Sequence, residues 1–333
     1  MCVSLRPAHF SDTIVGVFEG PDGRRYLAYQ NTAANLQGSG QKAATHSPAP
    51  RPVTPATVKR GSRRQPGKTN QWSFETAVTP GAKIPGAAEN LGGNAMILPI
   101  PDDVANIELI DTTTCPNFLK DIRSALIPRR RGTLRGSADG MKNGPVRIIN
   151  FDVYTIVLAR NAADLKRAIA SEAVPADRRP QIEADMIKAY TRWYPGWAIA
   201  VCCFNNSEAK TAKPLLFSYL PTKQADADHF FVPTLDAHDG KVPDLMAEVP
   251  VDHTVFVATA RIPEGCGSTV FYSDNMAAGI ARILPNRLVG RVITDSLRNG
   301  DLVFRRQDIE AGVFRALRAL PPGAEEVVTR LFV

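Results

Sequence analysis

The sequence has 333 residues, of which 44% are hydrophobic and 22% charged, a composition typical of folded globular proteins that excludes a fibrous chain. Its formal net charge is +7, which points toward an acidic partner. The apolar stretches are far shorter than the roughly 18–20 residues that a membrane-spanning helix needs, and we expect no secretory signal in residues 1–7. The five cysteines form neither a disulfide framework nor a C-x-x-C pair, so we expect a reducing, cytoplasmic location away from membranes.

The first ordered segment is predicted to be a β-hairpin. Residues 13–19 are rich in β-branched side chains, residues 20–23 carry turn-forming types, and residues 25–30 alternate between apolar and polar. Gly23 can adopt a positive φ without steric cost, and Asp22 can accept a hydrogen bond from the local backbone. We therefore assign residues 1–35 to an N-terminal hairpin region of the core.

Residues 36–71 differ in composition from the rest of the chain. Pro, Gly, Ser, Thr and Gln dominate there, as in the stretch SPAPRP at residues 47–52. Because few apolar side chains offset the entropy of ordering the backbone, we predict a disordered, Pro/Gly/Ser/Arg-rich insertion. Residues 72–333 then form the remainder of a single core, with a second basic, flexible loop at residues 129–145.

The first elements after the insertion are read from their hydrophobic periodicity. A buried strand is predicted at residues 95–100, where Pro99 favours a sheet edge or a strand end. Apolar residues at helical spacing predict a helix at 118–127, with Thr114 as its N-cap. A long β-rich run covers residues 146–158.

The second half of the core contains more strands than helices. Asn161 is predicted to cap a short helix that ends at residue 169, and the strongest amphipathic pattern covers residues 180–194. Asp308 is predicted to cap a final helix over 309–320. Consecutive strands with helices between them favour an α+β fold with a mostly antiparallel, mixed sheet and a few packed helices. The further predicted strands are residues 197–204, 214–220, 229–235, 251–260 and 269–272.

The excess positive charge is concentrated in the insertion. Residues 37–71 hold seven Lys and Arg and no Asp or Glu, so the other 33 basic residues match the 33 acidic ones. Basic loops of this kind neutralise acidic proteins or other polyanions. Aromatic side chains for base stacking are sparse, so we expect no sequence-specific nucleic-acid binding. The polyanion-binding candidates are Lys59, Arg60, Arg63, Arg64, Arg129, Arg130 and Arg131.

Three of the five histidines lie near carboxylates in the segment 226–253. On extended backbone Asp236 and His238 share one face, His229 falls on the other, and His253 could lie opposite the pair across a hairpin. Imidazole and carboxylate groups together bind divalent metals, so Asp236, His238 and His253 are candidate ligands for one divalent metal ion. The alternative is that these are turn-forming and strand-end polar residues.

Cys2 is the second catalytic candidate, because removal of Met1 would make it the first residue. The start Cys2-Val3-Ser4-Leu5, followed by a hairpin, resembles the cysteine branch of the N-terminal-nucleophile hydrolases. The resemblance implies a thiol nucleophile whose own α-amino group acts as base, on a strand of a layered α/β sandwich. Where that family has an Arg and an Asp after the hairpin turn, this chain has residues 28–31, AYQN.

Two classes of function follow. The first is a non-enzymatic binding or assembly protein whose flexible basic arm contacts an acidic partner, in agreement with the charge distribution and with the lack of P-loop, G-x-G-x-x-G, G-x-S-x-G and H-E-x-x-H motifs. The alternative is a hydrolase, either metal-assisted through Asp236, His238 and His253 or thiol-based through Cys2. The substrate and the oligomeric state stay open.

Overall fold

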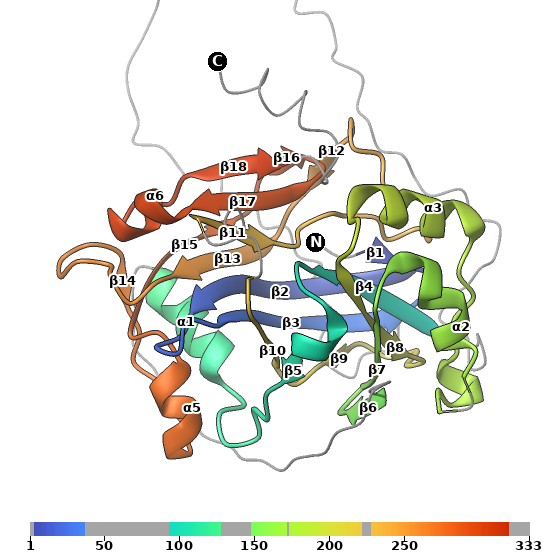
Figure 1. Cartoon of the computed structure of the whole chain (residues 1–333), viewed down its shortest axis with the longest axis horizontal. Helices are drawn as coiled ribbons and strands as arrows, with labels where there is room; N and C mark the ends of the chain where they lie inside the picture. Colours follow the sequence, from blue (N-terminus) through green and yellow to red (C-terminus); the bar gives the residue numbers. More distant parts are fainter. Residues whose placement is uncertain (1–2, 37–92, 128–147, 172, 222–227, 320–333) are drawn as a thin grey trace, which may run out of the picture.

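The computed structural model describes residues 3–36, 93–127, 148–171, 173–221 and 228–319. Within these ranges an eight-stranded and a five-stranded β-sheet pack together, with smaller sheets and short helices around them (Figure 1). Among the described strands, the ladder between β2 and β13 is parallel and the other ladders are antiparallel. The predicted α+β class is thereby confirmed. The predicted insertion, apart from residue 36, and the predicted loop at 129–145 lie outside the described residues.

The long N-terminal hairpin forms the centre of the eight-stranded sheet. β2 (Ala8–Glu19) and β3 (Arg25–Asn35) pair antiparallel across the turn, as predicted. In that turn Gly23 has a φ of +74°, and Asp22 Oδ1 accepts a hydrogen bond from the Arg24 amide at 3.1 Å. The local turn chemistry read from the sequence therefore sets the geometry of this hairpin.

The eight-stranded sheet has the order β14-β15-β13-β2-β3-β10-β5, and β9 also pairs with β3. Helix α1 packs against β15, β14 and β3, and α5 precedes β15. These other elements are α1 (Phe118–Leu126), α5 (Ala278–Ile283), β5 (Glu108–Leu109), β9 (Lys210–Thr211), β10 (Leu215–Tyr219), β13 (His253–Ala258), β14 (Ser268–Thr269) and β15 (Arg287–Ile293).

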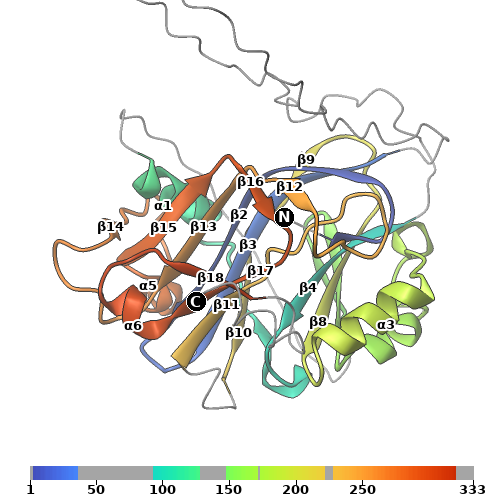
Figure 2. The same ribbon diagram turned by 90° about the horizontal axis from the view of Figure 1, so that it is seen from above.

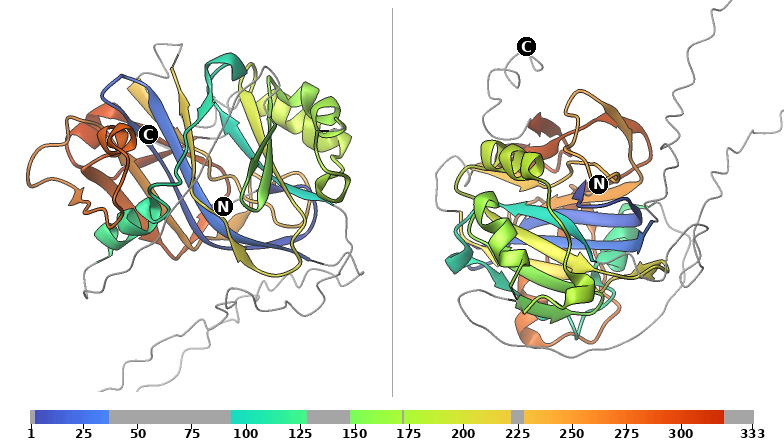
Figure 3. Two further views of the ribbon diagram at one scale, coloured as in Figure 1. Left: turned by 90° about the horizontal axis from the view of Figure 1, so that it is seen from below. Right: turned by 90° about the vertical axis from the view of Figure 1, so that its right-hand side faces the viewer.

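The five-stranded sheet separates two hydrophobic cores. Alternate side chains such as Met96 and Cys202 face the eight-stranded sheet, while Ile97 and Cys203 face helices α2 and α3. Figure 2 and the left view of Figure 3 show this layering, with the green helices outermost. The sheet order is β1-β4-β8-β7-β6. The bounds are β1 (Val3–Ser4), β4 (Asn94–Ile100), β6 (Ile148–Phe151), β7 (Tyr154–Ala159), β8 (Ala198–Phe204), α2 (Leu165–Ile169) and α3 (Ala184–Trp193).

A three-stranded sheet, β11-β17-β18, lies against the hairpin, with β11 in contact with β2. Helix α6 follows β17 directly, and a two-stranded sheet joins β12 to β16. No helix in the described ranges is long and apolar enough to cross a membrane. The bounds are β11 (His229–Val232), β12 (Glu248–Pro250), β16 (Ser296–Arg298), β17 (Asp301–Arg305), α6 (Arg306–Glu310) and β18 (Ala316–Ala319), with 3-10 turns at Val104–Asn106, Ala162–Asp164 and Ala176–Arg178.

Several predicted elements differ from the structure. The run at 146–158 is a hairpin, because Asp152 takes a φ of +56° and turns the chain between β6 and β7. Helix α1 has Asn117 rather than Thr114 at its N-cap, and the Thr114 hydroxyl accepts a hydrogen bond from the Ala277 amide instead. Helix α3 begins at Ala184, later than predicted.

The prediction of a C-terminal helix over residues 309–320 was wrong. Instead of one helix over 309–320, the chain forms the short helix α6 and then β18, which pairs antiparallel with β17. Asp308 lies inside α6 rather than at its cap. Pro99 lies one residue before the end of β4, in agreement with the predicted strand end rather than with an edge strand. Because β1 covers only Met96 and Ile97 of β4, the proline costs the β1–β4 ladder no hydrogen bond.

Candidate functional site

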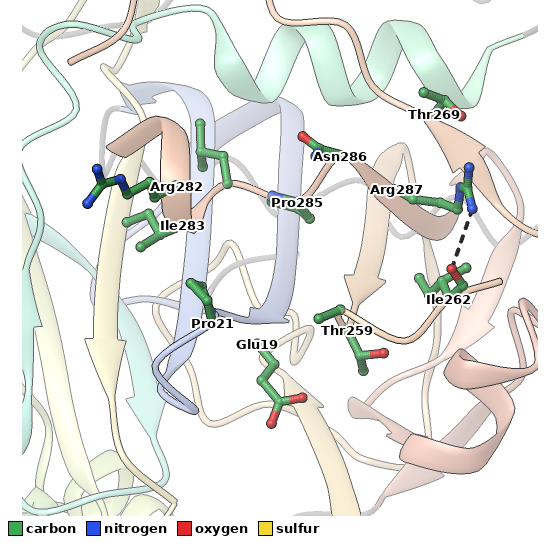
Figure 4. A pocket seen from close by; sticks show the side chains of 12 residues that line it. Glu19, Pro21, Thr259, Ile262, Thr269, Arg282, Ile283, Pro285, Asn286 and Arg287 are labelled. Atoms are coloured by element: carbon green, nitrogen blue, oxygen red, sulfur yellow. Dashed lines mark hydrogen bonds between the residues drawn. The ribbon is translucent and has the colours of Figure 1, made fainter. Parts of the chain in front are cut away.

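A half-open cavity of about 400 Å³ lies beside the turn of the long hairpin. Its walls are Glu19 and Pro21 of the hairpin, Thr259 just after β13, and the segment from Arg282 to Arg287 between α5 and β15 (Figure 4). Ligand pockets commonly enclose about 300–1,000 Å³. The cavity is therefore large enough for part of a peptide or a small molecule.

The carboxylate of this cavity is bound by an arginine from the far end of the sequence. Arg306, the first residue of α6, donates Nη1 to Glu19 Oε2 at 2.6 Å and Nη2 to Oε1 at 2.9 Å. Arg25, the first residue of β3, lies 3.6 Å from the same carboxylate, and its side chain is 1% exposed. Bidentate binding of this kind is strong and directional. It ties the hairpin turn to α6.

The electrostatic balance around Glu19 is positive. Burial acts to raise the pKa of Glu19, but the hydrogen bond from Arg306 and the charges of Arg25, Arg306 and Arg261 outweigh burial and lower it. The carboxylate is therefore ionised at neutral pH. Arg261 is 74% exposed and lies 3.9 Å from Glu310, which also contacts Arg306 at 3.3 Å.

Phe230 of β11 provides the surface on which Arg25 and Arg306 rest. The Arg25 Cζ atom lies 3.6 Å from the ring centroid, and the Arg306 Cζ atom lies 5.5 Å from it. A guanidinium over an aromatic face is attracted by the ring quadrupole. Burial lowers the pKa of Arg25, and the charge of Glu19 opposes that shift. These contacts explain how a strand with a fully buried face accepts an arginine.

Two arginines that line the cavity have no carboxylate partner among the described residues. Arg287 donates only a long hydrogen bond, 3.5 Å, to the Ile262 carbonyl, and Arg282 is exposed. In Figure 4 the two lie toward opposite ends of the cavity, with Pro285 between them and the Arg282 guanidinium pointing outward. The cavity thus carries cationic groups at both ends.

Two of the three predicted metal ligands are brought together. His238 Nε2 lies 2.9 Å from Asp236 Oδ1, although the nitrogen is not aligned to donate a hydrogen bond to it. This segment runs beside the first strand, where the Ser4 amide donates to the Ala237 carbonyl at 2.9 Å. His253 lies elsewhere, on β13 between β2 and β15. In the described part of the chain, no group of three His, Cys, Asp or Glu is arranged to hold a metal ion.

A further histidine, which sequence spacing did not suggest, joins the Asp236–His238 pair. The rings of His238 and Phe10 make an edge contact with their centroids 5.0 Å apart. Burial lowers the pKa of His9, and the charge of the nearby His238 lowers it further. Because β2 supplies His9 and a distant loop supplies His238, only the fold brings these imidazoles together.

The other predicted site residues, Cys2 and the seven basic candidates, lie outside the described residues. Two described cysteines are unreactive by environment, since burial raises the pKa of the Cys115 and Cys203 thiols to about 12 each. Cys202 is also buried.

The arginine cluster around Glu19 was missed by sequence reasoning. The arginine pairs at 24–25 and 305–306 are the only local signals; the first adjoins the predicted hairpin turn, and the second precedes the predicted final helix. The local sequence around these pairs does not indicate that they come together in the fold, because Glu19 and Arg306 are 287 positions apart. Arg25 is the one charged residue of β3, and a charged residue in a strand that packs into the core is the pattern that would direct attention to it.

No family model matches the chain, and no curated protein matches it. A crystal structure of baculovirus P35 is similar with a TM-score of 0.39 at 12% identity, covering 92% of each chain. A crystal structure of a mutated baculovirus P35 after caspase cleavage has a TM-score of 0.37 at 11% identity, covering 90% of this chain and 92% of that one. Similarity at this level assigns no function to this chain.

Proposed function

We propose that this chain is a non-enzymatic binding or assembly protein that contacts an acidic partner through its basic insertion. The distribution of charge carries the proposal. All of the net charge of +7 is accounted for by the seven basic residues in 37–71, and the rest of the chain is balanced. A folded domain that bound polyanions with its own surface would carry the excess there instead.

Retention on a heparin column in low salt tests the proposal. The full chain is compared with a variant in which residues 37–71 are replaced by a short Gly/Ser linker. Loop closure changes by only about 0.6 kcal/mol per twofold change in loop length, so the variant is expected to fold. We expect it to elute at clearly lower salt than the full chain, because the seven charges are gone.

A second variant, which removes four positive charges outside the insertion where the deletion removes seven, helps to separate local charge from total charge. The four exposed basic residues Arg160, Lys166, Arg167 and Arg192 lie on the side of the five-stranded sheet and its helices. Changing all four to Gln lowers the net charge without touching residues 37–71. The control is expected to stay close to the full chain in retention. Equal retention of the full chain and the deletion variant would refute the proposal.

The alternative proposal is a hydrolase, and the Asp236–His238 contact is the observation that favours it. A carboxylate beside an imidazole is the usual arrangement of a base and the group that orients it. Hydrolysis of generic ester and amide substrates, abolished by Asp236→Asn, would support this version. The Cys2 version needs a free N-terminal thiol, and an intact mass that includes Met1 would end it.

A further inference from the structure

The cavity beside the hairpin turn fits an acidic ligand independently of the insertion. We propose that it is the docking site for an extended acidic peptide segment of the partner, with one acidic side chain near Arg282, another near Arg287, and an apolar residue between them. This inference rests on the proposed function, which it makes more specific. It assigns a site within the folded core to the partner.

The charges around the cavity favour an anionic occupant. Glu19 is already neutralised by the bidentate contact with Arg306, at 2.6 and 2.9 Å. Arg282 and Arg287 line the same cavity without a carboxylate partner among the described residues. Asp22, in the neighbouring turn, is occupied by hydrogen bonds from the Arg24 amide and the Tyr26 hydroxyl. A carboxylate near Arg282 would meet an exposed guanidinium, and one near Arg287 would meet a guanidinium whose described hydrogen bond is the long one, 3.5 Å, to the Ile262 carbonyl.

The shape of the cavity favours a segment of chain over a small anion. Arg282 and Arg287 lie toward opposite ends of the cavity in Figure 4, which favours a ligand that extends from one end to the other. Between them the cavity is lined in part by apolar side chains, with Ile283 and Pro285 facing Pro21. Alternate side chains of an extended peptide lie roughly 6–7 Å apart on one face, which lets two acidic groups flank an apolar one.

The cavity wall is held in place before any ligand binds. The Tyr272 hydroxyl donates to the Pro285 carbonyl at 2.8 Å, and the Val270 amide donates to the Asn286 carbonyl at 2.9 Å. On the other wall, the Arg306 contact anchors Glu19. Walls fixed in this way lose little conformational entropy on binding, which favours recognition of a peptide.

Fluorescence anisotropy with a labelled peptide tests the inference. The probe is a fluorescein-labelled peptide of sequence GSESLSEGS, in which the two Glu and the Leu share one face of the extended chain, and its match carries Gln in place of both Glu. The full chain is compared with Arg282→Gln/Arg287→Gln and with the control Arg160→Gln/Arg192→Gln, which changes the charge equally on the other side of the molecule. All four positions are at least partly exposed, and thermal unfolding checks that each variant folds.

We expect the cavity variant to bind the acidic peptide about tenfold more weakly, equivalent to about 1.4 kcal/mol from two partly exposed ion pairs. The control variant should bind the acidic peptide with the affinity of the full chain. The Gln peptide should bind all three proteins weakly, with the affinity that the acidic peptide has for the cavity variant. Unchanged affinity in the cavity variant would overturn the inference. Full displacement of the peptide by millimolar inorganic phosphate, with equal binding of the Gln peptide, would also overturn it.

These results are distinguishable from failure of the proposed function. If the deletion variant loses heparin retention while the cavity variant binds the peptide normally, the inference fails and the proposed function stands. If the deletion variant keeps heparin retention while the cavity variant loses the peptide, the cavity remains a peptide site and the role of the insertion fails.

Discussion

Glu19 is predicted to be the group that makes the buried Arg25 tolerable, and Glu19→Gln tests this. The substitution keeps the size of the side chain but removes the charge that faces two guanidinium groups. Arg25 lies 3.6 Å from Glu19 and its side chain is 1% exposed. At an effective dielectric constant of about 20, two unit charges at that distance interact by about 5 kcal/mol. Removing one partner of a buried pair typically costs about 3–5 kcal/mol.

We expect the lower end, a loss of about 3 kcal/mol, because Glu19 is 20% exposed and Phe230 remains against Arg25. Urea unfolding at pH 7, followed by tryptophan fluorescence, measures the loss. Asp185→Asn is the control, since the Asp185–Lys188 pair is 79% and 76% exposed and should contribute nothing measurable. The double variant Glu19→Gln/Arg25→Met should recover at least half of the loss. A Glu19→Gln variant as stable as the control, or no recovery in the double variant, would refute the reasoning.

Three other predictions concern stability and reactivity. Burial raises the pKa of Asp301 to about 6 from 3.8, so between these values the folded protein holds a proton that the unfolded chain has released. The free energy of unfolding should therefore fall as the pH rises from about 4 through about 6. Urea unfolding of Asp301→Asn should show no such fall. Gly16→Ala should lower the free energy of unfolding by about 2 kcal/mol or more, because the added Cβ would lie 2.4 Å from the Phe256 side chain. As a control, Gly279→Ala should raise the free energy of unfolding by up to about 1 kcal/mol, because a Cβ there has no other atom within 4 Å. Cys115 should resist iodoacetamide at pH 8 by mass spectrometry until the protein is unfolded in urea, because burial raises the pKa of its thiol to about 12.

The elements that the sequence predicted correctly are those with a local cause. Asn161 caps its turn because its own side chain accepts a hydrogen bond from the Asp164 amide at 3.1 Å. Gly23 marks the hairpin because the turn needs a positive φ, and the continuous apolar run of β8 follows from its position between two cores. Each of these signals lies within a few residues of the structure that it specifies.

The elements that were predicted wrongly depend on distant partners. Residues 316–319 have good helix formers, yet they form β18 because pairing with β17 outweighs a weak intrinsic preference. The same reason limits the candidate site. The Asp236–His238 proximity follows from spacing on extended backbone, whereas the meeting of Glu19 with Arg306 follows only from the packing of α6 against the hairpin.

The salt dependence of polyanion binding tests the role of the insertion most directly. The probe is a fluorescein-labelled single-stranded oligo(dT), used as a polyanion of uniform charge spacing, and anisotropy gives its affinity at several salt concentrations. Each phosphate neutralised on a single strand contributes about 0.7 to the slope of log K against log salt. We predict that changing Lys59, Arg60, Arg63 and Arg64 to Gln lowers this slope by up to about 3 and weakens binding. An unchanged slope and affinity would contradict contact between the insertion and an acidic partner.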